Sequence, residues 1–142
     1  TYLWLYDAKV NGKVVYGNKD ILKEIRIPQE INQQLFKKIL LWLKVLLENL
    51  SFHPPPSPDM RANIISYALL YYTTCLIALK SGKVLFKKEQ LAEMCKELFD
   101  TDLIYQAIKY KHIDHISKDE AERFHDRAVS FMIESSKEIE LV

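Results

Sequence analysis

The chain has 142 residues, of which 49% are hydrophobic and 27% are charged, and its formal net charge is +1. This length and composition exclude a disordered chain and favour a folded protein of ordinary domain size. A net charge close to zero produces no strong field toward nucleic acid or a membrane surface. We therefore expect neither nucleic acid nor membrane among the partners.

Two cysteines, Cys75 and Cys95, fall on apolar faces of expected helices. Such positions favour buried thiols in a reducing compartment, with a disulfide as the weaker alternative. No signal-peptide pattern opens the chain, so we expect a cytoplasmic protein. The chain begins with Thr1 rather than Met, and we expect it to be a piece of something longer.

The first 18 residues predict a β-hairpin. Aromatic and branched residues between Leu3 and Val10 are typical of a strand. Asn11-Gly12 favours a type I′ turn, whose two central positions need positive φ, and Lys13–Tyr16 forms the expected return strand. A lone hairpin is marginal in water. We expect it to pack on the helices or to complete a sheet that lies upstream of Thr1.

Residues 19–142 predict a mainly α, up-and-down bundle of four to five helices. A short helix is expected over Asp20–Ile25, and a longer one begins after Pro28 and runs from about Gln29 to Leu50. Its apolar residues recur at helical spacing: Ile31, Leu35, Ile39, Trp42, Leu43, Leu46 and Leu50. The four prolines between Phe52 and Asp59 then favour a stiff helix-to-helix connector, with a proline-rich recognition ligand as the alternative.

The central helix is expected to begin with Asp59 as its cap and to stop at Ser81-Gly82. Its segment Ile64–Leu79 is apolar on every side, which predicts that other elements surround it. That segment is shorter than the roughly 20 residues that cross a membrane. The rest of the chain therefore has to pack around this helix.

Three further helices are expected after Gly82. The first has Leu91, Met94, Cys95 and Leu98 on one face, and the second is short, with Leu103, Ile104 and Ile108, and closes at residues 110–112. The last opens with a capping box, Ser117 and Glu120, and runs to about Ile139. Its inward residues are expected to be Ala121, Phe124, Ala128, Phe131, Met132 and Ile139.

Two acidic and histidine-rich stretches offer weak metal signals. Asp100-Thr101-Asp102 has the spacing of a magnesium pair, but it lies between helices without a preceding Gly-Ser turn, so helix capping is the favoured interpretation. His112, Asp114 and His115, with His125 further along, match no strong zinc pattern. We therefore expect no metal ligands among these residues.

A basic segment precedes the helix that follows Gly82. Lys83, Lys87 and Lys88 lie where backbone N–H groups and the helix dipole already favour an anion. A lysine there would pair with phosphate as a point charge. By spacing alone a solvated charged turn is the more common explanation.

A longer pattern joins the central helix to this segment: Tyr71, Tyr72, Cys75, Leu79, Ser81, Gly82, Lys83, Lys87 and Glu89. It resembles the C-terminal helical domain of aminoglycoside nucleotidyltransferases, above all the streptomycin/spectinomycin adenylyltransferase group. Ala107-Ile108-Lys109-Tyr110 resembles the family's following Ala-x-x-Tyr element, and residues 1–18 resemble the last hairpin of its nucleotidyltransferase sheet. The helical domain would then span residues 19–142.

The resemblance implies an enzyme that transfers AMP from ATP to a hydroxyl of a small acceptor. Mg²⁺ and the catalytic carboxylates would belong to a domain upstream of Thr1, so this chain would have no catalytic residue and would help to bind ATP and the acceptor. By position, Lys87 would contact an ATP phosphate and Tyr110 would help to order it, with Lys83 and Lys88 as neighbours. The region around Asp59 departs from the family's drug-contacting pattern, which argues against an antibiotic acceptor.

Two alternatives remain open at this point. The chain could be a stand-alone binding module that acts with a separate nucleotidyltransferase chain. It could also be a non-catalytic helical scaffold that forms a homo-oligomer through the edge of its hairpin.

Overall fold

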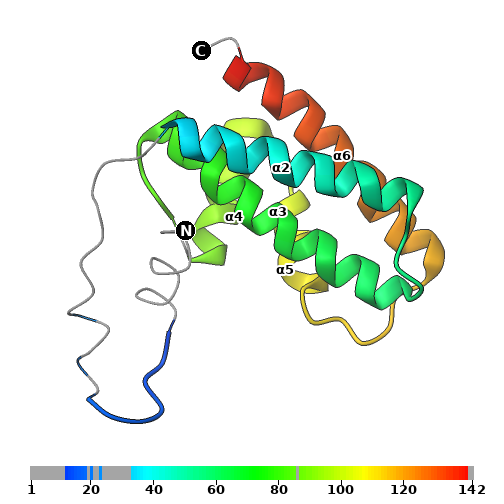
Figure 1. The fold of residues 1–142 in the computed structure, drawn as a ribbon, viewed down its shortest axis with the longest axis horizontal. Helices are drawn as coiled ribbons and strands as arrows, with labels where there is room; N and C mark the ends of the chain where they lie inside the picture. Colours follow the sequence, from blue (N-terminus) through cyan, green and yellow to red (C-terminus); the bar gives the residue numbers. More distant parts are fainter. Residues whose placement is uncertain (1–11, 19, 21–22, 24–32, 86, 141–142) are drawn as a thin grey trace.

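A computed structural model describes residues 12–18, 20, 23, 33–85 and 87–140 (Figure 1). Five helices fill most of this part of the chain: α2 (Gln33–Phe52), α3 (Pro58–Ser81), α4 (Lys88–Phe99), α5 (Leu103–Tyr110) and α6 (Lys118–Glu140). The expected mainly α fold is confirmed.

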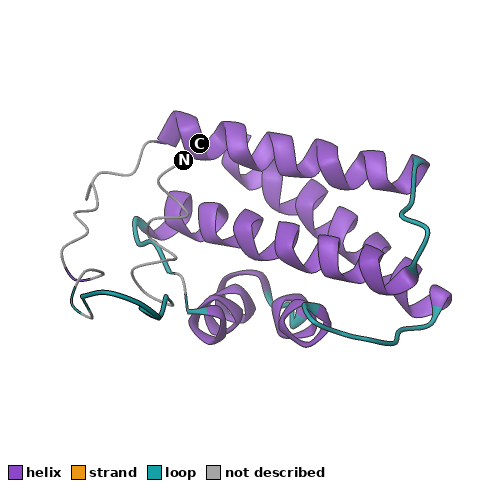
Figure 2. Ribbon diagram, turned by 60° about the horizontal axis from the view of Figure 1, so that its bottom comes forward, coloured by secondary structure: helices purple, strands orange, loops and turns teal. Residues whose placement is uncertain are grey.

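The three long helices α2, α3 and α6 pack against one another, and α3 also contacts α4 and α5. Neighbours α2 and α3 run in opposite directions, whereas α6 runs in the same direction as α3 (Figure 1). Figure 2 shows α4 and α5 as a second layer that crosses beneath the long helices. This pair returns the chain to the end at which α3 began, and it interrupts the expected up-and-down order.

Helix α3 is the centre of the fold because most of its circumference is covered. Its residues Ile65, Leu69, Tyr72, Leu76 and Ile77 are fully buried. Burial of each large side chain of this kind contributes about 1.5–3 kcal/mol relative to leaving it exposed. Tyr67 and Tyr71 are the departure from the expectation, since each keeps more than a third of its surface exposed.

The boundaries of α3 arise from local backbone chemistry. Ser57 is the N-cap, and its Oγ accepts a hydrogen bond from the backbone N–H of Met60 at 3.4 Å. The expectation that Asp59 caps this helix is therefore wrong, because the Asp59 carboxylate accepts from the backbone N–H of Ile116 instead. At the other end Gly82 adopts φ +74°, the left-handed conformation that ends a helix as expected.

By length and composition, α3 is the one helix in the described ranges that could cross a bilayer. The whole helix is longer than the apolar segment Ile64–Leu79. Within its most apolar stretch of 18 residues, 72% is buried inside the bundle. This burial is what the core helix of a soluble protein shows.

The buried stripe of α2 differs from the expected one by about one residue. Phe36, Leu40, Leu43 and Leu47 are buried, whereas Trp42 is 64% exposed. Leu41 and Val45 are also exposed, so α2 has apolar residues on several sides. Periodicity alone could not choose among these faces.

The remaining helices agree closely with the sequence. The capping box at α6 is present on its serine side, because Ser117 Oγ accepts from the backbone N–H of Glu120 at 3.1 Å. On α4, Leu91 and Cys95 are buried as expected, but Leu98 is 42% exposed. Both cysteines are free and buried, as the sequence predicted.

The expected hairpin lies mostly outside the described residues. Gly12–Asn18 are described and contain no strand, so the return strand at Lys13–Tyr16 is a correction to the sequence prediction. Val15 and Tyr16 are more than 90% exposed and have no ladder partner within the described ranges, so nothing there stabilises an extended pairing. The expected helix at 20–25 also lies mostly outside, although Lys23 N–H donates to Asp20 O at 3.0 Å.

Candidate functional site

The three lysines predicted from the sequence occupy the turn between α3 and α4, and they differ in burial. Lys83 and Lys87 are exposed, and Lys87 is the N-cap residue of α4. Lys88, the first residue of α4, is half-buried. Lys88 lines a cavity.

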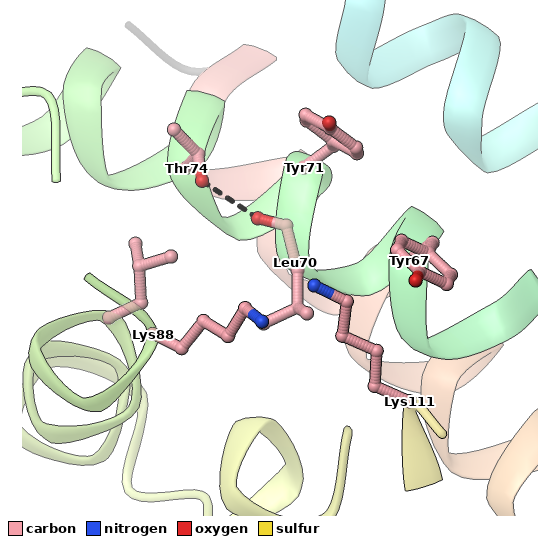
Figure 3. A pocket seen from close by; sticks show the side chains of 7 residues that line it. Tyr67, Leu70, Tyr71, Thr74, Lys88 and Lys111 are labelled. Carbon is pink, nitrogen blue, oxygen red and sulfur yellow. Dashed lines mark hydrogen bonds between the residues drawn. The ribbon is translucent and has the colours of Figure 1, made fainter. Parts of the chain in front are cut away.

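That cavity is a shallow cleft between α3 and the α4–α5 layer, with a volume of about 90 Å³. Its walls come from α3, from the start of α4 and from the residue after α5: Tyr67, Leu70, Tyr71, Thr74, Lys88, Leu91 and Lys111. Figure 3 shows the Lys88 and Lys111 side chains extending toward the same region beside Leu70. The cleft therefore brings together two ammonium groups that lie 23 residues apart in sequence, counting from 88 to 111.

The aromatic wall is held against one of these cations. The Lys111 ammonium group lies 4.7 Å from the centroid of the Tyr67 ring, within the range of a cation–π contact. The His112 ring also contacts Tyr67 in a T-shaped arrangement, with ring centroids 6.2 Å apart. These contacts orient Tyr67 at the rim of the cleft.

The Thr74 side chain adds no free hydrogen-bond donor to the floor of the cleft. The Thr74 hydroxyl donates to the carbonyl of Leu70 at 2.8 Å, one turn earlier on α3 (Figure 3). Because this hydroxyl is bonded within the helix, Leu70 and Leu91 form an apolar base for the cleft that the two lysines also line. Positive charge in the cleft thus stands against an apolar surface, where it is less screened than in open water.

Tyr110 does not reach this cleft. It is 8% exposed and packs edge-on against Phe124 at 5.0 Å between ring centroids. Its backbone carbonyl accepts from Asn63 Nδ2 at 2.9 Å, which ties the end of α5 to α3. Through these contacts Tyr110 fixes the position of the neighbouring Lys111.

The arrangement suits a small anion. Two lysines and the N-terminus of α4 supply positive charge, and lysine acts as a point charge toward phosphate. The volume of about 90 Å³ has room for a group on the scale of one phosphate. A complete nucleotide would extend well beyond the cleft.

The sequence did not assign Lys111, Tyr67 or Tyr71 to a binding site, although Tyr71 belongs to the pattern quoted for the resemblance. A signal existed for the tyrosines, since Tyr67, Tyr71 and Thr74 are polar-tipped residues spaced by four and three on an otherwise apolar helix. Lys111 gave no comparable signal, because its place depends on how the α4–α5 layer crosses α3.

The acidic turn at 100–102 serves structural roles. Asp100 ends α4 with φ +50°, and Thr101 Oγ1 accepts from the backbone N–H of Leu103 at 3.3 Å. Asp102 accepts from Arg127 Nη2 at 3.0 Å, and this guanidinium lowers the pKa of the Asp102 carboxyl below its usual value. The capping interpretation is thus supported through Thr101 rather than through the side chain of Asp102.

His125 lies apart from the other predicted histidines. It is fully buried, whereas His112 and His115 are exposed. No group of three His, Cys, Asp or Glu side chains in the described part of the chain could hold a metal ion.

Comparison with protein-family models, with curated proteins and with solved structures gave no match. The resemblance to adenylyltransferases therefore rests on the residues quoted for it.

Proposed function

We propose that this chain is the helical, substrate-side domain of a nucleotidyltransferase, and that the cleft between Lys88 and Lys111 receives a phosphate of Mg-ATP. The observation that carries the proposal is the meeting of two lysines from separate elements on one apolar, tyrosine-walled cleft. One of these lysines, Lys88, belongs to the basic segment that resembles the family's nucleotide-contacting turn.

The size of the cleft implies that two domains bind different parts of the nucleotide. A volume of about 90 Å³ suits one phosphate group, so the base, the ribose and Mg²⁺ would be held by a catalytic domain in the same protein or in a partner chain. In this proposal the chain is not catalytic alone. It positions the nucleotide and presents an acceptor, which lowers the entropic cost of bringing the two reactants together.

The role of Lys87 changes in this proposal. It was the strongest candidate by position, but its side chain is exposed at the cap of α4. We assign direct phosphate contact to Lys88 and Lys111, and we assign to Lys83 and Lys87 the weaker role of raising the local positive potential. Tyr110 supports Lys111 from the core.

The test is Mg-ATP binding by isothermal titration calorimetry at low salt. A charge-assisted hydrogen bond contributes about 1.5–3 kcal/mol, so Lys88→Ala and Lys111→Ala should each weaken binding about tenfold or more. Lys87→Ala should weaken it by less. Lys96→Ala is the matched control, because Lys96 is an exposed lysine in the last turn of the same helix.

Three outcomes would count against the proposal. Unchanged affinity in the Lys88→Ala, Lys111→Ala double variant would remove the cleft from nucleotide binding. A large loss in Lys87→Ala alone would return the contact to the exposed turn. A chain that shows no affinity for millimolar Mg-ATP and sediments as a dimer would favour the non-catalytic scaffold.

A further inference from the structure

A second and larger cavity lies at the N-terminal end of α3, whereas the cleft that contains Lys88 and Lys111, hereafter the lysine cleft, is lined by the middle of this helix. Its volume is about 380 Å³, within the usual range of small-molecule sites. The connector between α2 and α3 forms one wall, and the first turns of α3 and α6 form the other: Pro54, Pro55, Pro56, Pro58, Arg61, Lys118, Ala121 and Glu122.

Arg61 is held in place by a buried histidine. Its Nε and Nη2 atoms lie 2.9 and 2.6 Å from His125 Nδ1. His125 is fully buried, and its Nε2 lies 2.8 Å from the carbonyl oxygen of Leu47. A carbonyl only accepts and a guanidinium only donates, so this chain of bonds requires a neutral imidazole with its proton on Nε2.

The neutral histidine leaves the charge of Arg61 uncompensated. The half-buried Arg61 forms no ion pair with a carboxylate of any described residue, and neither does Lys118. The two contacts of the guanidinium with His125 use Nε and Nη2, and Nη1 has no hydrogen-bond partner within the described ranges. A half-buried guanidinium with an unused N–H pair beside a cavity is suited to pair with an anion.

The charged residues that line the cavity are Arg61, Lys118 and Glu122, with a net charge of +1, and the first turn of α6 also carries Asp119 and Glu120. Lys118 is the first residue of α6, and Arg61 lies in the beginning of α3, so two helix N-termini with positive partial charge border the same space. Asp59 is bonded to the backbone N–H of Ile116 rather than to a cation. Glu122 is the one acid among the lining residues, against two cations.

The proline wall adds a second requirement. Pro54, Pro55 and Pro56 are consecutive rings that line the cavity and carry no backbone N–H. They provide apolar contact but no hydrogen-bond donor. A fitting ligand therefore has a charged end and an apolar end.

We propose that this cavity binds a small organic anion, a carboxylate or a phosphate monoester, whose charged group pairs with Arg61 and Lys118 while its apolar part lies on the prolines. This site is separate from the lysine cleft, with which it shares no lining residue. Its central cation is oriented by the bonds through His125 to Leu47, which fix the guanidinium before any ligand arrives.

The probes are phenyl phosphate and benzoate, added to the full chain and followed by backbone amide shifts in ¹H–¹⁵N spectra. Saturable shifts should appear in the first turns of α3 and α6. The probe that binds with the higher affinity, phenyl phosphate or benzoate, then indicates whether the ligand is a phosphate or a carboxylate. Benzyl alcohol, which lacks the charge, and inorganic phosphate, which lacks the apolar group, should each bind at least about tenfold more weakly.

Charge variants at the rim give effects of opposite sign. Lys118→Gln should weaken binding about three- to fivefold, and Glu122→Gln should strengthen it about threefold, because exposed charges make modest contributions to ion pairing. Lys137→Gln, an exposed lysine at the far end of α6, is the matched control. Arg61→Gln should abolish binding, and its circular dichroism spectrum shows whether the fold is retained.

Several results would overturn this site. They are absence of shifts with both probes at 10 mM, equal binding of benzyl alcohol, and affinities unchanged by both rim variants. Loss of phenyl phosphate binding in Lys88→Ala would place the anion in the other cleft instead. Because the rim variants change exposed or half-buried side chains, the test holds even if Arg61→Gln does not fold.

Discussion

The hydroxyl of Tyr72 joins the two longest helices inside the core, and its removal gives a defined test of the packing. Tyr72 is fully buried on α3. Its Oη lies 3.1 Å from the carbonyl oxygen of Met132 and 2.8 Å from Ser135 Oγ, both on α6. Tyr72→Phe deletes these bonds and keeps the ring, which packs edge-on against Phe131.

The expected loss follows from what remains after the deletion. Ser135 Oγ keeps a bond to the carbonyl of Phe131 at 2.6 Å, so the change leaves no buried donor without a partner. The cost is then about one net buried hydrogen bond and a small void, which amounts to about 1–2 kcal/mol. For a chain of this size that lowers Tm by about 3–6 °C.

Urea melts of wild type and Tyr72→Phe give this difference directly, and Tyr105→Phe is the control because Tyr105 is 42% exposed. A double-mutant cycle with Ser135→Ala should give a coupling energy of about 1 kcal/mol, since the two hydroxyls share one bond. If Tyr72→Phe is as stable as Tyr105→Phe, the α3–α6 hydrogen bond is not part of the native core.

Three further predictions concern other parts of the fold. Gly82→Ala should cost about 1 kcal/mol in urea melts because φ is +74° there, although no atom within 4 Å would meet the new Cβ. Burial raises the pKa values of Cys75 and Cys95 to about 12, so iodoacetamide should label neither thiol in the native protein and both in denaturant, as mass spectrometry would show. Burial, with the Arg61 charge, lowers the pKa of His125 below 6.5, although the Leu47 carbonyl opposes this. As pH falls below 6.5, the unfolded state binds more protons than the native state does. The contribution of neutral His125 to stability is therefore complete above pH 6.5 and is lost as pH falls toward the lower native pKa.

Each of these has a contrary result. Gly82→Asn should lose less than Gly82→Ala, because asparagine tolerates the left-handed region, and equal losses would show that backbone strain is not the cause. Native labelling of either cysteine at the rate of a free thiol would show that the α3–α4 contact opens readily. In the His125→Gln variant the slope of stability between pH 7 and 5 should flatten, and an unchanged slope would assign it to other groups.

Helix ends were predictable where the sequence has a residue type that strongly favours one position at a helix end. Gly82 ended α3 and Ser117 capped α6 as the sequence indicated, because few other residues stabilise those backbone positions. The cap of α3 was assigned two residues too late. Ser57 and Asp59 are both good caps, and only the contact of Asp59 with the distant Ile116 decides between them.

The faces of α2 and the membership of the site were not predictable in the same way. Leu41, Trp42 and Val45 are as apolar as the buried stripe of α2, and which side faces inward depends on where α3 and α6 lie. Lys88 was a candidate from the local pattern, but its pairing with Lys111 depends on the crossing of two layers. A local sequence pattern does not indicate whether residues from two different layers lie close together.

The two walls of the lysine cleft belong to different layers, and this affects how ligand binding would be detected. Tyr67 and Tyr71 stand on α3, whereas Lys88 and Lys111 flank the α4–α5 pair. Segments of this kind often open as one unit before the rest of a domain unfolds, so the amides of α4 and α5 should exchange with deuterium sooner than those of α3. An anion that bridges both walls binds only the closed arrangement and stabilises it by mass action. Occupancy of the cleft should therefore slow deuterium uptake in α4 and α5 and leave the exchange of α2 unchanged.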